Sequence, residues 1–560
     1  MRILGLNGND DSGVSLLEGG KIKYAVNEER LNRIKLYKGF PSKSIKLTLE
    51  ENKLKADDID KVIVTAYVSR KLNAKTYLKK LLSTSPRYHY YILGRLKYMN
   101  HVYNTEFKDT YKNAKKLFPN SEVIGFDHHL AHAASAHFTS GMEKNLVITC
   151  DGAGDGLSNG AYIGNGTELR KIHSSSDLDS LGYFYGRLTV ALGFKFHRHE
   201  GKVTGLAAYA KPTKRLMNIM KKMIYFDRKS MSFKSKIGKF YIPSSDVDKK
   251  LIQFFSQFKK AEVAASAQLW LEEVFRQYMD TLIKEVGPSN VALAGGVFGN
   301  VKLNQRINET SGVKNIFIHP HMGDGGLGMG GALYAHNMEK PMNVKLRDVY
   351  FGPEYSEQEV KRQVIKSKLK HEYHKDISGA AAKLLAKGQI VARCDGRMEY
   401  GPRALGNRTI MYQTTDPSIN DWLNKNLNRT EFMPFAPVVL SRFAKKCFNN
   451  IKGAEYAAKF MTITFDCTEW MAKTCPGVVH LDNTARPQLI DKETNYGYNK
   501  ILEEYNKLTG IPVLINTSYN MHEEPIICTP GDAIRSFKAG KLQNLVLGNY
   551  LISQKVKFKI

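Results

Sequence analysis

One pattern occurs twice in the chain: Arg2-Ile3-Leu4-Gly5-Leu6-Asn7-Gly8-Asn9-Asp10-Asp11-Ser12-Gly13 and Leu146-Val147-Ile148-Thr149-Cys150-Asp151-Gly152-Ala153-Gly154-Asp155-Gly156. In each copy an apolar strand runs into an acidic, glycine-rich turn, and a second strand follows (14–17 and 160–163). Tight turns at Gly19-Gly20 and at 164–166 then lead into third strands over 22–26 and 168–172. The repeat predicts a duplicated α/β unit.

This layout is typical of the actin, Hsp70 and sugar-kinase superfamily. There, two ribonuclease-H-like halves close on a nucleotide, and the first hairpin of each half meets phosphates and metal. We therefore expect an α/β fold whose N-terminal domain is a duplicated ribonuclease-H-like, actin-type ATPase domain. Two unrelated hairpins are the alternative, but the matching order of their elements favours duplication.

A histidine pair follows the helical period in Asp127-His128-His129-Leu130-Ala131-His132. On a helix, His128 and His132 lie on one face, one turn apart, and can share a divalent cation. Such a pair alone is more often structural. The acidic, glycine-rich loops that carry Asp151 and Asp324 favour the metal site, because carboxylates complete the shell of such an ion.

The composition is that of a globular protein with two or three domains: 560 residues, of which 42% are hydrophobic and 10% aromatic. No apolar run approaches the roughly 20 residues of a membrane span, and the N-terminus lacks the apolar core of a signal peptide. The six cysteines form no CxxC pair, which disfavours a zinc ribbon or a disulfide framework. We expect a reduced, cytoplasmic protein.

The net charge is +29, from 83 basic and 54 acidic residues. This excess attracts polyanions such as nucleic acid and nucleotides, although a solvated lysine-rich surface gives the same count. Basic residues and tyrosines alternate over 69–97, which fits a nucleic-acid surface or, equally, a helical domain with buried tyrosines. The oligomeric state stays open, with a homodimer as one option.

Changes in residue composition and periodicity along the chain predict the domain organisation. The segment 40–120 reads as helical, 212–260 as a polar insertion with loops, and 261–286 as one helix before a strand over 291–293. Proline and glycine gather over 341–353. We therefore expect a first domain over 1–345, with halves 1–144 and 145–345, and a second over 346–560. The second domain has apolar runs at 389–393, 436–440, 461–465 and 512–515.

Four polar motifs mark the second domain. The segment 396–408 packs three arginines and three glycines into thirteen residues, and 428–437, 484–488 and 516–520 add further polar groups. Arginine binds phosphate or carbamoyl oxygens in a bidentate manner, and glycine lets the backbone approach a ligand. We place each motif at the end of a predicted strand, where ligands sit in open α/β sheets. A single arginine is more often a surface ion pair, but four such motifs favour one anion-binding cavity.

These motifs, in their order, resemble those of the NodU/CmcH-type O-carbamoyltransferases, which include TobZ. The matching strings are DHHLAHAAS (127–135), EGKVTGLAAY (200–209), LAGGVFGN (293–300), HPHMGDGGLGMGGAL (319–333), GRMEYGPRALGNR (396–408), NRTEFMPFAP (428–437), TARPQ (484–488) and LINTSYN (514–520). The resemblance covers nearly the whole chain. It implies a TsaD-like N-terminal domain and a YrdC-like C-terminal domain.

The resemblance also implies a two-step reaction. The C-terminal domain joins carbamoyl phosphate to ATP, with Mg²⁺, and releases pyrophosphate to leave carbamoyl adenylate. The N-terminal domain then passes the carbamoyl group to an acceptor hydroxyl and releases AMP. The family's divalent metal, typically iron as Fe²⁺, would be held here by His128, His132, Asp151 and Asp324.

Further site residues follow from the matching positions. The residues implied to hold carbamoyl phosphate and ATP are Arg397, Arg403, Arg408, Arg429, Arg486, Ser518 and Asn520. Those implied to bind the nucleotide in the first domain are Glu200, Lys202, Gly295, Gly296, Asn300 and Asn304.

The first hairpin departs from the family pattern. Relatives carry His-Asp where this chain has Asp10-Asp11. Asp10 either replaces that histidine as general base, with a pKa raised by its surroundings, or marks a changed acceptor or a weakened transfer step. Arg33 and Lys35 match a basic family segment, whose usual following histidine is absent here. We count Asp10, Asp11, Arg33 and Lys35 as the catalytic candidates.

Other functions remain as alternatives. A tRNA threonylcarbamoyl-type enzyme is disfavoured by the fused YrdC-like segment. A hydrogenase-maturation carbamoyltransferase carries that segment first and has zinc CxxC motifs, which are missing here. A transfer-inactive, nucleotide-binding regulatory protein would retain the fold. For the acceptor we favour a nucleotide or a nucleic-acid base bearing a hydroxyl, on the evidence of the +29 charge, with a small molecule as the alternative.

Overall fold

The computed structural model describes residues 1–65, 74–244, 249–428, 430 and 432–555. The chain divides into two compact units. Unit 1 comprises Met1–Lys23 and Lys38–Leu346, and unit 2 comprises Tyr24–Tyr37 and Arg347–Ile560. The short segment Tyr24–Tyr37 thus belongs to unit 2. A single boundary between residues 345 and 346 assigns this segment to the first domain.

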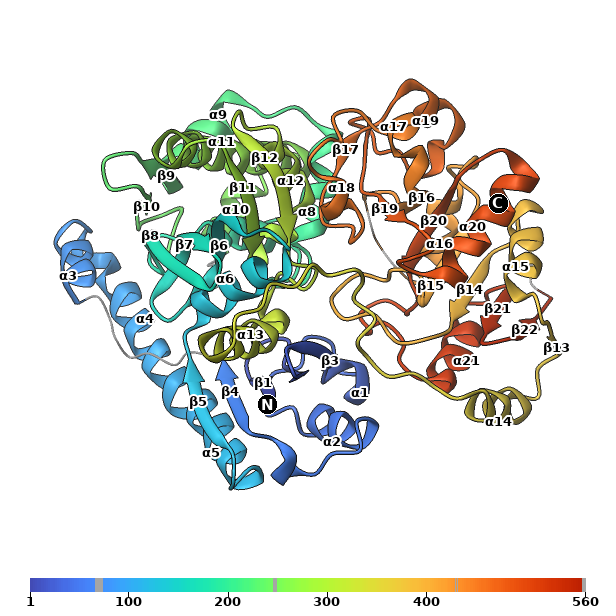
Figure 1. Cartoon of the computed structure of the whole chain (residues 1–560). Coiled ribbons are helices and arrows are strands. Elements are labelled where there is room, and N and C mark those ends of the chain that lie inside the picture. The colour runs from blue at the N-terminus through green and yellow to red at the C-terminus, as the bar shows by residue number, and fades with distance from the viewer. Residues whose placement is uncertain (66–73, 245–248, 429, 431, 556–560) are drawn as a thin grey trace. The chain divides into compact units, whose positions relative to one another are not determined.

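The first sheet of unit 1 begins with the N-terminal hairpin (Figure 1). Its order is β3-β2-β1-β4-β5. The strands are β1 (Arg2–Asn7), β2 (Gly13–Glu18), β3 (Lys21–Asn27), β4 (Lys61–Thr65) and β5 (Glu122–Phe126). β1 pairs antiparallel with β2 and parallel with β4, which is parallel to β5. Apolar residues of β1, such as Ile3, Leu4 and Leu6, are fully buried and anchor the core.

The second sheet repeats this plan. Its strands are β6 (Lys144–Gly154), β7 (Leu157–Asn165), β8 (Glu168–Ser176), β11 (Ser289–Ala294) and β12 (Val313–Ile318), in the order β12-β11-β6-β7-β8. β6, β7 and β8 are antiparallel, and β11 is parallel to both β6 and β12. Each sheet therefore has an antiparallel three-stranded meander followed by two parallel strands. The predicted duplication is confirmed.

Two helices connect the halves of unit 1. α6 (His128–Thr139) packs on the second sheet and α13 (Leu327–Glu339) on the first, and the two helices pack against each other. Their close approach requires glycine, because a Cβ built on Gly330 would lie 1.9 Å from the carbonyl oxygen of Ala131. The residue pattern of α13 therefore sets the position of α6, which carries the histidine pair.

Helices fill most of the remainder of unit 1. They are α2 (Ser42–Glu51), α3 (Ala74–Leu82), α4 (His89–Val102), α5 (Lys108–Leu117), α7 (Leu181–Ala191), α8 (Glu200–Leu206), α9 (Lys214–Met223), α10 (Lys249–Phe255), α11 (Lys260–Val286) and α12 (Val301–Asn308). The segment 40–120 is mainly helical as expected, but β4 interrupts it. The expected loops over 212–260 contain α9, α10 and a two-stranded ribbon of β9 (Ile224–Asp227) and β10 (Ser232–Ser235).

The tyrosines of the basic segment 69–97 divide between core and surface; positions 66–73 lie outside the described residues. Tyr77 is buried and its hydroxyl contacts the carboxylate of Asp177. Tyr90 is 61% exposed. Among the described residues, none of the helices combines the length and apolarity that crossing a membrane requires.

Unit 2 is built on one mixed sheet of the order β13-β22-β21-β14-β15-β20-β16-β19. Its strands are β13 (His371–Tyr373), β14 (Val391–Cys394), β15 (Arg408–Tyr412), β16 (Ala436–Leu440), β19 (Gln488–Ile490), β20 (Val513–Ser518), β21 (Asn544–Leu547) and β22 (Tyr550–Ser553). Its helices are α1 (Glu29–Asn32), α14 (Glu357–Ser367), α15 (Ile377–Ala386), α16 (Ile419–Asn426), α17 (Ala444–Cys447), α18 (Glu455–Ala458), α19 (Glu469–Thr474), α20 (Tyr496–Thr509) and α21 (Pro530–Ala539).

The core of unit 2 lies between this sheet and the helices α15 and α20, with Leu385, Val391, Leu502 and Leu514 at its centre. Three of the four expected apolar runs form strands, namely β14, β16 and β20. The run 461–465 does not; only its last residue enters the short strand β17 (Phe465–Asp466), which pairs with β18 (Thr484–Ala485).

Candidate active site

The histidine pair occupies the first turns of α6, as its spacing predicts. Asp127 is the N-cap residue, and its Oδ1 accepts the backbone N–H of Leu130 at 2.7 Å. The backbone N–H of His128 donates to Oδ2 of Asp155 at 2.9 Å. Both contacts fix the start of the helix. The ring centroids of His128 and His132 lie 4.8 Å apart, and both side chains are fully buried.

Two carboxylates meet these imidazoles. Nε2 of His132 lies 3.1 Å from Oδ2 of Asp151 and 3.5 Å from Oδ1 of Asp324. Nε2 of His128 lies 3.9 Å and 3.7 Å from the same two oxygens. Donor atoms bound about 2.1 Å from one ion lie roughly 3.0–3.4 Å apart, so these separations fit a shared divalent cation after small adjustments. The nitrogen and oxygen donors suit iron, manganese or zinc.

The charges of the two histidines and the two aspartates act on one another. Burial acts to raise the pKa of Asp151, but hydrogen bonds and charges from His128 and His132 outweigh it and hold that pKa well below its usual range. Burial raises the pKa of Asp324 against the opposing charge of His128. Burial also disfavours the charged form of His128, yet the two carboxylates raise its pKa to about 9. The carboxylates therefore draw positive charge into the site, which a divalent cation would supply.

Glycine-rich loops surround the four groups. The backbone N–H of Gly296 donates to Oδ2 of Asp151 at 3.1 Å, which places the loop after β11 beside a candidate ligand. A Cβ on Gly154 would lie 2.2 Å from Cδ2 of His128, so this position in the acidic turn must be glycine. The acidic turn of the second copy thus supplies the ligand Asp151 and clearance for His128, and the loop after β11 supplies a backbone donor.

The first hairpin reaches the same region. The side-chain amide of Asn7 donates to the carbonyl oxygens of Asp10 at 2.8 Å and Asp324 at 2.9 Å. Oδ2 of Asp11 lies 3.4 Å from Nε2 of His321. The structure therefore brings the candidates Asp10 and Asp11 to the edge of the four-residue group.

The predicted nucleotide-binding residues of unit 1 lie in two places. Gly295 and Gly296 border Asp151. Asn300 caps α12 and its amide donates to Oε1 of Gln268 at 2.8 Å, and the hydroxyl of Tyr185 donates to the same oxygen. Glu200 is the first residue of α8, and its charge acts on Tyr185, so Glu200 belongs to this second group. Figure 1 labels both helices, α8 and α12.

Two further positions complete that set. The amide of Asn304 donates to the carbonyl of Phe298 at 2.7 Å, so it holds the loop before α12. Lys202 is buried in α8. Nucleotide contacts by these residues stay predictions.

The four motifs of unit 2 converge at one end of its sheet. Arg408 begins β15, Ser518 ends β20, and the two strands are antiparallel with Thr409 opposite Ser518. The segment 428–435 leads into β16, and Arg486 lies just before β19. The motif 396–408 follows the end of β14 and 516–520 ends β20, as expected, whereas 428–437 and 484–488 lead into β16 and β19. The four motifs still lie at the same end of the sheet, because β20 runs antiparallel to β15 and β16.

Side-chain amides join these motifs. Nδ2 of Asn516 donates to the carbonyl of Ala404 at 3.1 Å, and Nε2 of Gln488 donates to that of Leu405 at 2.8 Å. Nδ2 of Asn520 donates to the carbonyls of Met521 and Glu524, both at 2.9 Å. Arg403 and Arg486 are half-buried beside these loops, and Arg429 lies outside the described residues.

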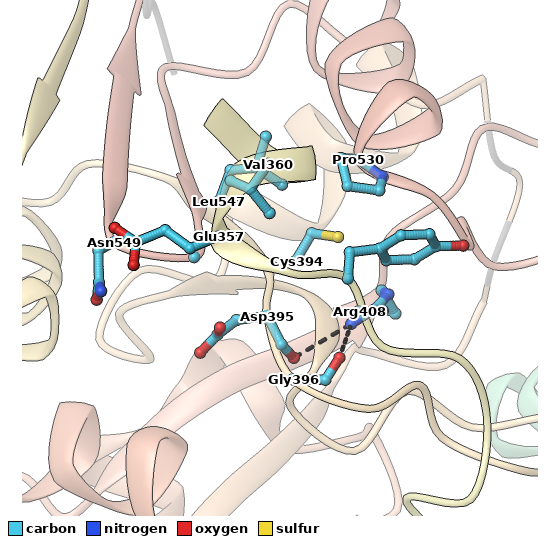
Figure 2. Close-up of a pocket in the computed structure, with 11 residues that line it drawn as sticks. Glu357, Val360, Cys394, Asp395, Gly396, Arg408, Pro530, Leu547 and Asn549 are labelled. Atoms are coloured by element: carbon cyan, nitrogen blue, oxygen red, sulfur yellow. Dashed lines mark hydrogen bonds between the residues drawn. The ribbon is translucent and has the colours of Figure 1, made fainter. Parts of the chain in front are cut away.

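Two predicted phosphate-binding arginines have main-chain partners. The guanidinium of Arg397 donates to the carbonyls of Phe351 at 2.7 Å and Gly352 at 3.2 Å. Arg408 is 1% exposed and donates to the carbonyls of Asp395, Gly396 and Cys528, as Figure 2 shows for the first two. Both arginines therefore hold loop backbone, and their contact with phosphate stays a prediction.

A cavity of about 140 Å³ lies beside Arg408 (Figure 2). Its lining includes Cys394 and Asp395 at the end of β14, Leu547 at the end of β21, and Glu357 at the start of α14. The guanidinium of Arg408 is bound to carbonyls, and Arg393 is paired with the carboxylate of Asp395 at 2.6 Å. Both arginines are therefore already engaged, so this cavity is a poor candidate for carbamoyl phosphate.

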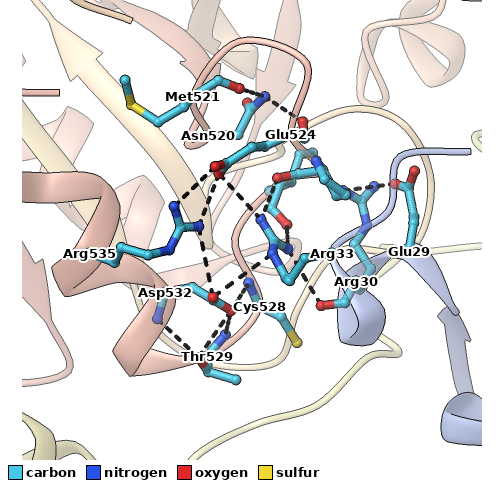
Figure 3. A network of polar contacts seen from close by, with 12 residues as sticks. Glu29, Arg30, Arg33, Asn520, Met521, Glu524, Cys528, Thr529, Asp532 and Arg535 are labelled. Carbon is cyan, nitrogen blue, oxygen red and sulfur yellow. Dashed lines mark hydrogen bonds and ion pairs between the residues drawn. The ribbon is translucent and has the colours of Figure 1, made fainter. Parts of the chain in front are cut away.

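Arg33 lies in the N-terminal segment of unit 2 (Figure 3). Its Nη1 donates to the carbonyl of Ile526 at 2.8 Å and its Nη2 to that of Pro525 at 2.7 Å. Arg30 donates to the carbonyl of Gly401 at 2.8 Å. Arg33 and Lys35 thus belong to the unit that carries the arginine motifs, whereas Asp10 and Asp11 belong to unit 1.

Sequence reasoning missed Glu399, although it stands inside the motif 396–408. Its Oε1 accepts the backbone N–H groups of Leu405 at 2.9 Å, Asn407 at 2.7 Å and Arg408 at 3.0 Å. The side chain is 3% exposed. A carboxylate among three glycines was the available signal, because a tight loop leaves backbone donors that need an acceptor.

Two family models match the chain: "Carbamoyltransferase N-terminus" over residues 2–333 and "Carbamoyltransferase C-terminus" over 382–554. An uncharacterized protein of Methanocaldococcus jannaschii is 34% identical over 99% of this chain and 99% of its own length. The nodulation protein NolNO of Sinorhizobium fredii is 31% identical over 97% of this chain and 79% of its own length. The nodulation protein NolO of Bradyrhizobium diazoefficiens is 31% identical over 77% of this chain and 79% of its own length.

Solved structures show a weaker likeness. Component A of the (R)-2-hydroxyglutaryl-CoA dehydratase of Acidaminococcus fermentans covers 60% of this chain and 98% of its own, with 15% identity and a TM-score of 0.34. Full-length HypF in its phosphate- and nucleotide-bound form covers 60% of this chain and 46% of its own, with 16% identity and a TM-score of 0.33.

Proposed function

This chain belongs to the carbamoyltransferase family, and on that basis we propose that it is an ATP-dependent O-carbamoyltransferase that works in two steps. In the first step, carbamoyl phosphate and ATP form carbamoyl adenylate and pyrophosphate in unit 2. In the second, the carbamoyl group passes to an acceptor hydroxyl in unit 1 and AMP is released. The observation that carries the proposal is the group of His128, His132, Asp151 and Asp324, whose donor atoms lie within 4.8 Å of one another.

The route through an adenylate has a physical reason. The carbonyl of carbamoyl phosphate is stabilised by resonance and reacts poorly. AMP is a good leaving group, and binding of its adenosine helps to orient the carbonyl. We assign the first step to unit 2, at the end of the sheet where Arg403, Arg486 and Ser518 border one region. Arg429, which lies outside the described residues, stays a candidate for the same step.

We assign the adenylate-binding role in unit 1 to the glycine loop after β11. Gly295 and Gly296 follow this strand directly, and the lack of a side chain lets a phosphate approach the backbone closely. Their own N–H groups donate to the carbonyl of Met322 at 2.6 Å and to Oδ2 of Asp151 at 3.1 Å, which holds the loop beside a candidate metal ligand. His128, His132, Asp151 and Asp324 would hold the divalent cation, iron in keeping with the family resemblance. When bound, the cation supplies positive charge that stabilises phosphate oxygens as AMP departs.

For the acceptor we propose a nucleotide or a nucleic-acid base that bears a hydroxyl group. The support is the net charge of +29, because a positive field concentrates polyanions near the protein. Carbamoylation of sugars alone, with none of nucleotides or DNA, would refute this assignment while leaving carbamoyl transfer intact.

The experiment is a product analysis with the full-length protein, ATP, Mg²⁺, Fe²⁺ and carbamoyl phosphate. Nucleosides, hydroxymethylated DNA and sugars serve as acceptors, and mass spectrometry detects the gain of one carbamoyl group. We expect AMP and pyrophosphate as the nucleotide products. ADP and phosphate instead would contradict the adenylate route.

A further inference from the structure

A second polar group lies beside the first hairpin, on the side of the helical insertion. Nζ of Lys38 lies 2.9 Å from Oε1 of Glu106. The charge of Asp10 acts on both of these side chains, and all three charges act on the hydroxyl of Tyr98 on α4. Three segments of unit 1 therefore bring three charged groups and a phenol together: the first hairpin, the stretch at Lys38, and the continuous helix that carries Tyr98 and Glu106.

This group borders the proposed transfer site. The amide of Asn7 donates both to the carbonyl of Asp10 and to the carbonyl of the candidate metal ligand Asp324. Asn7 is fully buried, so it holds these two backbone positions at a fixed separation. A hydroxyl near Asp10 would consequently lie close to the reacting end of an adenylate bound at the four-residue site.

Glu106 is placed by an unusual backbone. The residues Tyr103–Phe107 form a π-helical turn between α4 and α5. Such turns are costly and occur frequently at functional sites. Oε2 of Glu106 is buried and accepts no hydrogen bond from any described residue. One carboxylate oxygen is thus held by Lys38, while the other is available to a group that enters the site.

We propose that Glu106 is the general base for the acceptor hydroxyl and that Lys38 orients it, a role that rests on the proposed carbamoyl transfer. The acceptor oxygen forms a bond to the carbamoyl carbon, and its proton moves to Oε2 of Glu106. The bond from that carbon to the adenylate oxygen breaks, and AMP leaves with the electron pair. Asp10 lines the acceptor side of this group, where relatives carry a histidine.

The electrostatics agree with this role. Burial raises the pKa of Glu106 above its usual range, Lys38 lowers it, and the charge of Asp10 raises it further. The charge of His101 on α4 also acts to lower the pKa of Glu106. A base with a raised pKa removes a proton more readily than an ordinary carboxylate does. Transfer should therefore increase as the pH rises through this pKa.

The test compares Glu106→Gln with wild type in the full-length protein, with ATP, Mg²⁺, Fe²⁺ and carbamoyl phosphate. Cytidine, N-acetylglucosamine and glycerol are the hydroxyl probes, and hydroxylamine is a nucleophile that needs no base. We expect Glu106→Gln to slow transfer to the hydroxyl that wild type modifies fastest by about a hundredfold or more. Trapping by hydroxylamine and carbamoyl-phosphate-dependent ATP–pyrophosphate exchange should stay within about twofold of wild type, because neither requires this proton transfer.

Two variants complete the test. Asp109→Asn, an exposed carboxylate three residues away, should leave all rates unchanged. Lys38→Met should move the acidic limb of the transfer profile to higher pH, because a neighbouring positive charge is lost. Transfer by Glu106→Gln at the wild-type rate and with the wild-type pH profile would overturn the inference. Absence of pyrophosphate exchange in wild type would instead overturn the proposed function, and this inference with it.

Discussion

At the scale of single residues, the four-residue group is the feature most sensitive to substitution. His132 lies nearest to both carboxylates, at 3.1 Å and 3.5 Å. We predict that His132→Ala loses a metal ion that the wild-type protein binds at about one per chain, because three ligands bind a divalent cation more weakly than four. Metal analysis after gel filtration measures this directly.

The matched control for that variant is His173→Ala. His173 lies on β8, is partly exposed, pairs with Glu285 at 2.8 Å and is not one of the four residues. Its substitution should leave the metal content at the wild-type level. An equal metal content in His132→Ala would show that the four residues are not the binding site.

Glu399 gives a second prediction at this scale. Glu399→Ala leaves the three backbone N–H groups of the arginine loop without their acceptor in a buried place. We expect a loss of about 3 kcal/mol in the free energy of unfolding of unit 2, together with loss of pyrophosphate exchange. Glu399→Gln keeps an acceptor oxygen and should cost less than half as much. Urea unfolding monitored by fluorescence distinguishes these outcomes; equal losses in both variants would mean that the carboxylate does not act as the acceptor.

At the scale of elements, the N-terminal segment Tyr24–Tyr37 holds the loop 520–528. Arg33 donates to two adjacent carbonyls there, and Asn520 closes the same loop through the carbonyl of Glu524. We predict that Arg33→Ala costs about 2 kcal/mol and raises the KM for carbamoyl phosphate more than it lowers kcat.

Arg535→Ala is the control for Arg33→Ala, because Arg535 also contacts the loop 520–528 (Figure 3). Arg535 pairs with Glu524 in a bidentate manner, but its side chain is 46% exposed, so the loss should stay below about 1 kcal/mol. A KM for carbamoyl phosphate that changes equally in both variants would argue against a specific role of Arg33.

The contact between α6 and α13 gives a further prediction. Gly330→Ala places a methyl group 1.9 Å from the carbonyl oxygen of Ala131 unless the helices separate. We expect a loss of about 1–3 kcal/mol, and weaker metal binding, because α6 carries both histidines. Gly94→Ala on α4 meets no atom within 4 Å and should be neutral or stabilising. Thermal unfolding with and without metal measures the stability and the metal affinity of both variants. Unchanged metal affinity in Gly330→Ala would show that the contact between α6 and α13 does not position the metal ligands.

At the scale of the whole molecule, the fold of unit 1 was the most predictable part. The repeated strand and acidic turn predicted both meanders, and the chain pairs β1 with β2 and β6 with β7 accordingly. β4 was missed because it is a five-residue strand inside a long helical region. Short parallel strands draw their stability from neighbours that a local pattern does not contain.

The candidate site was predictable where ligand spacing is local and less so where it depends on topology. His128 and His132 follow from the helical period, but the direction of the strands that bring 396–408, 484–488 and 516–520 together does not. The same limit explains why Arg33 was not expected in the unit of the arginine motifs. Its contacts join positions that lie 492 and 493 residues apart in the sequence.

The most direct test of the two-step account is ATP–pyrophosphate exchange in the full-length protein. The account predicts exchange that requires carbamoyl phosphate, persists in His128→Ala and is lost in Arg486→Ala, because the adenylate forms in unit 2 and is consumed in unit 1. Loss of exchange in His128→Ala, or exchange that needs no carbamoyl phosphate, would contradict it.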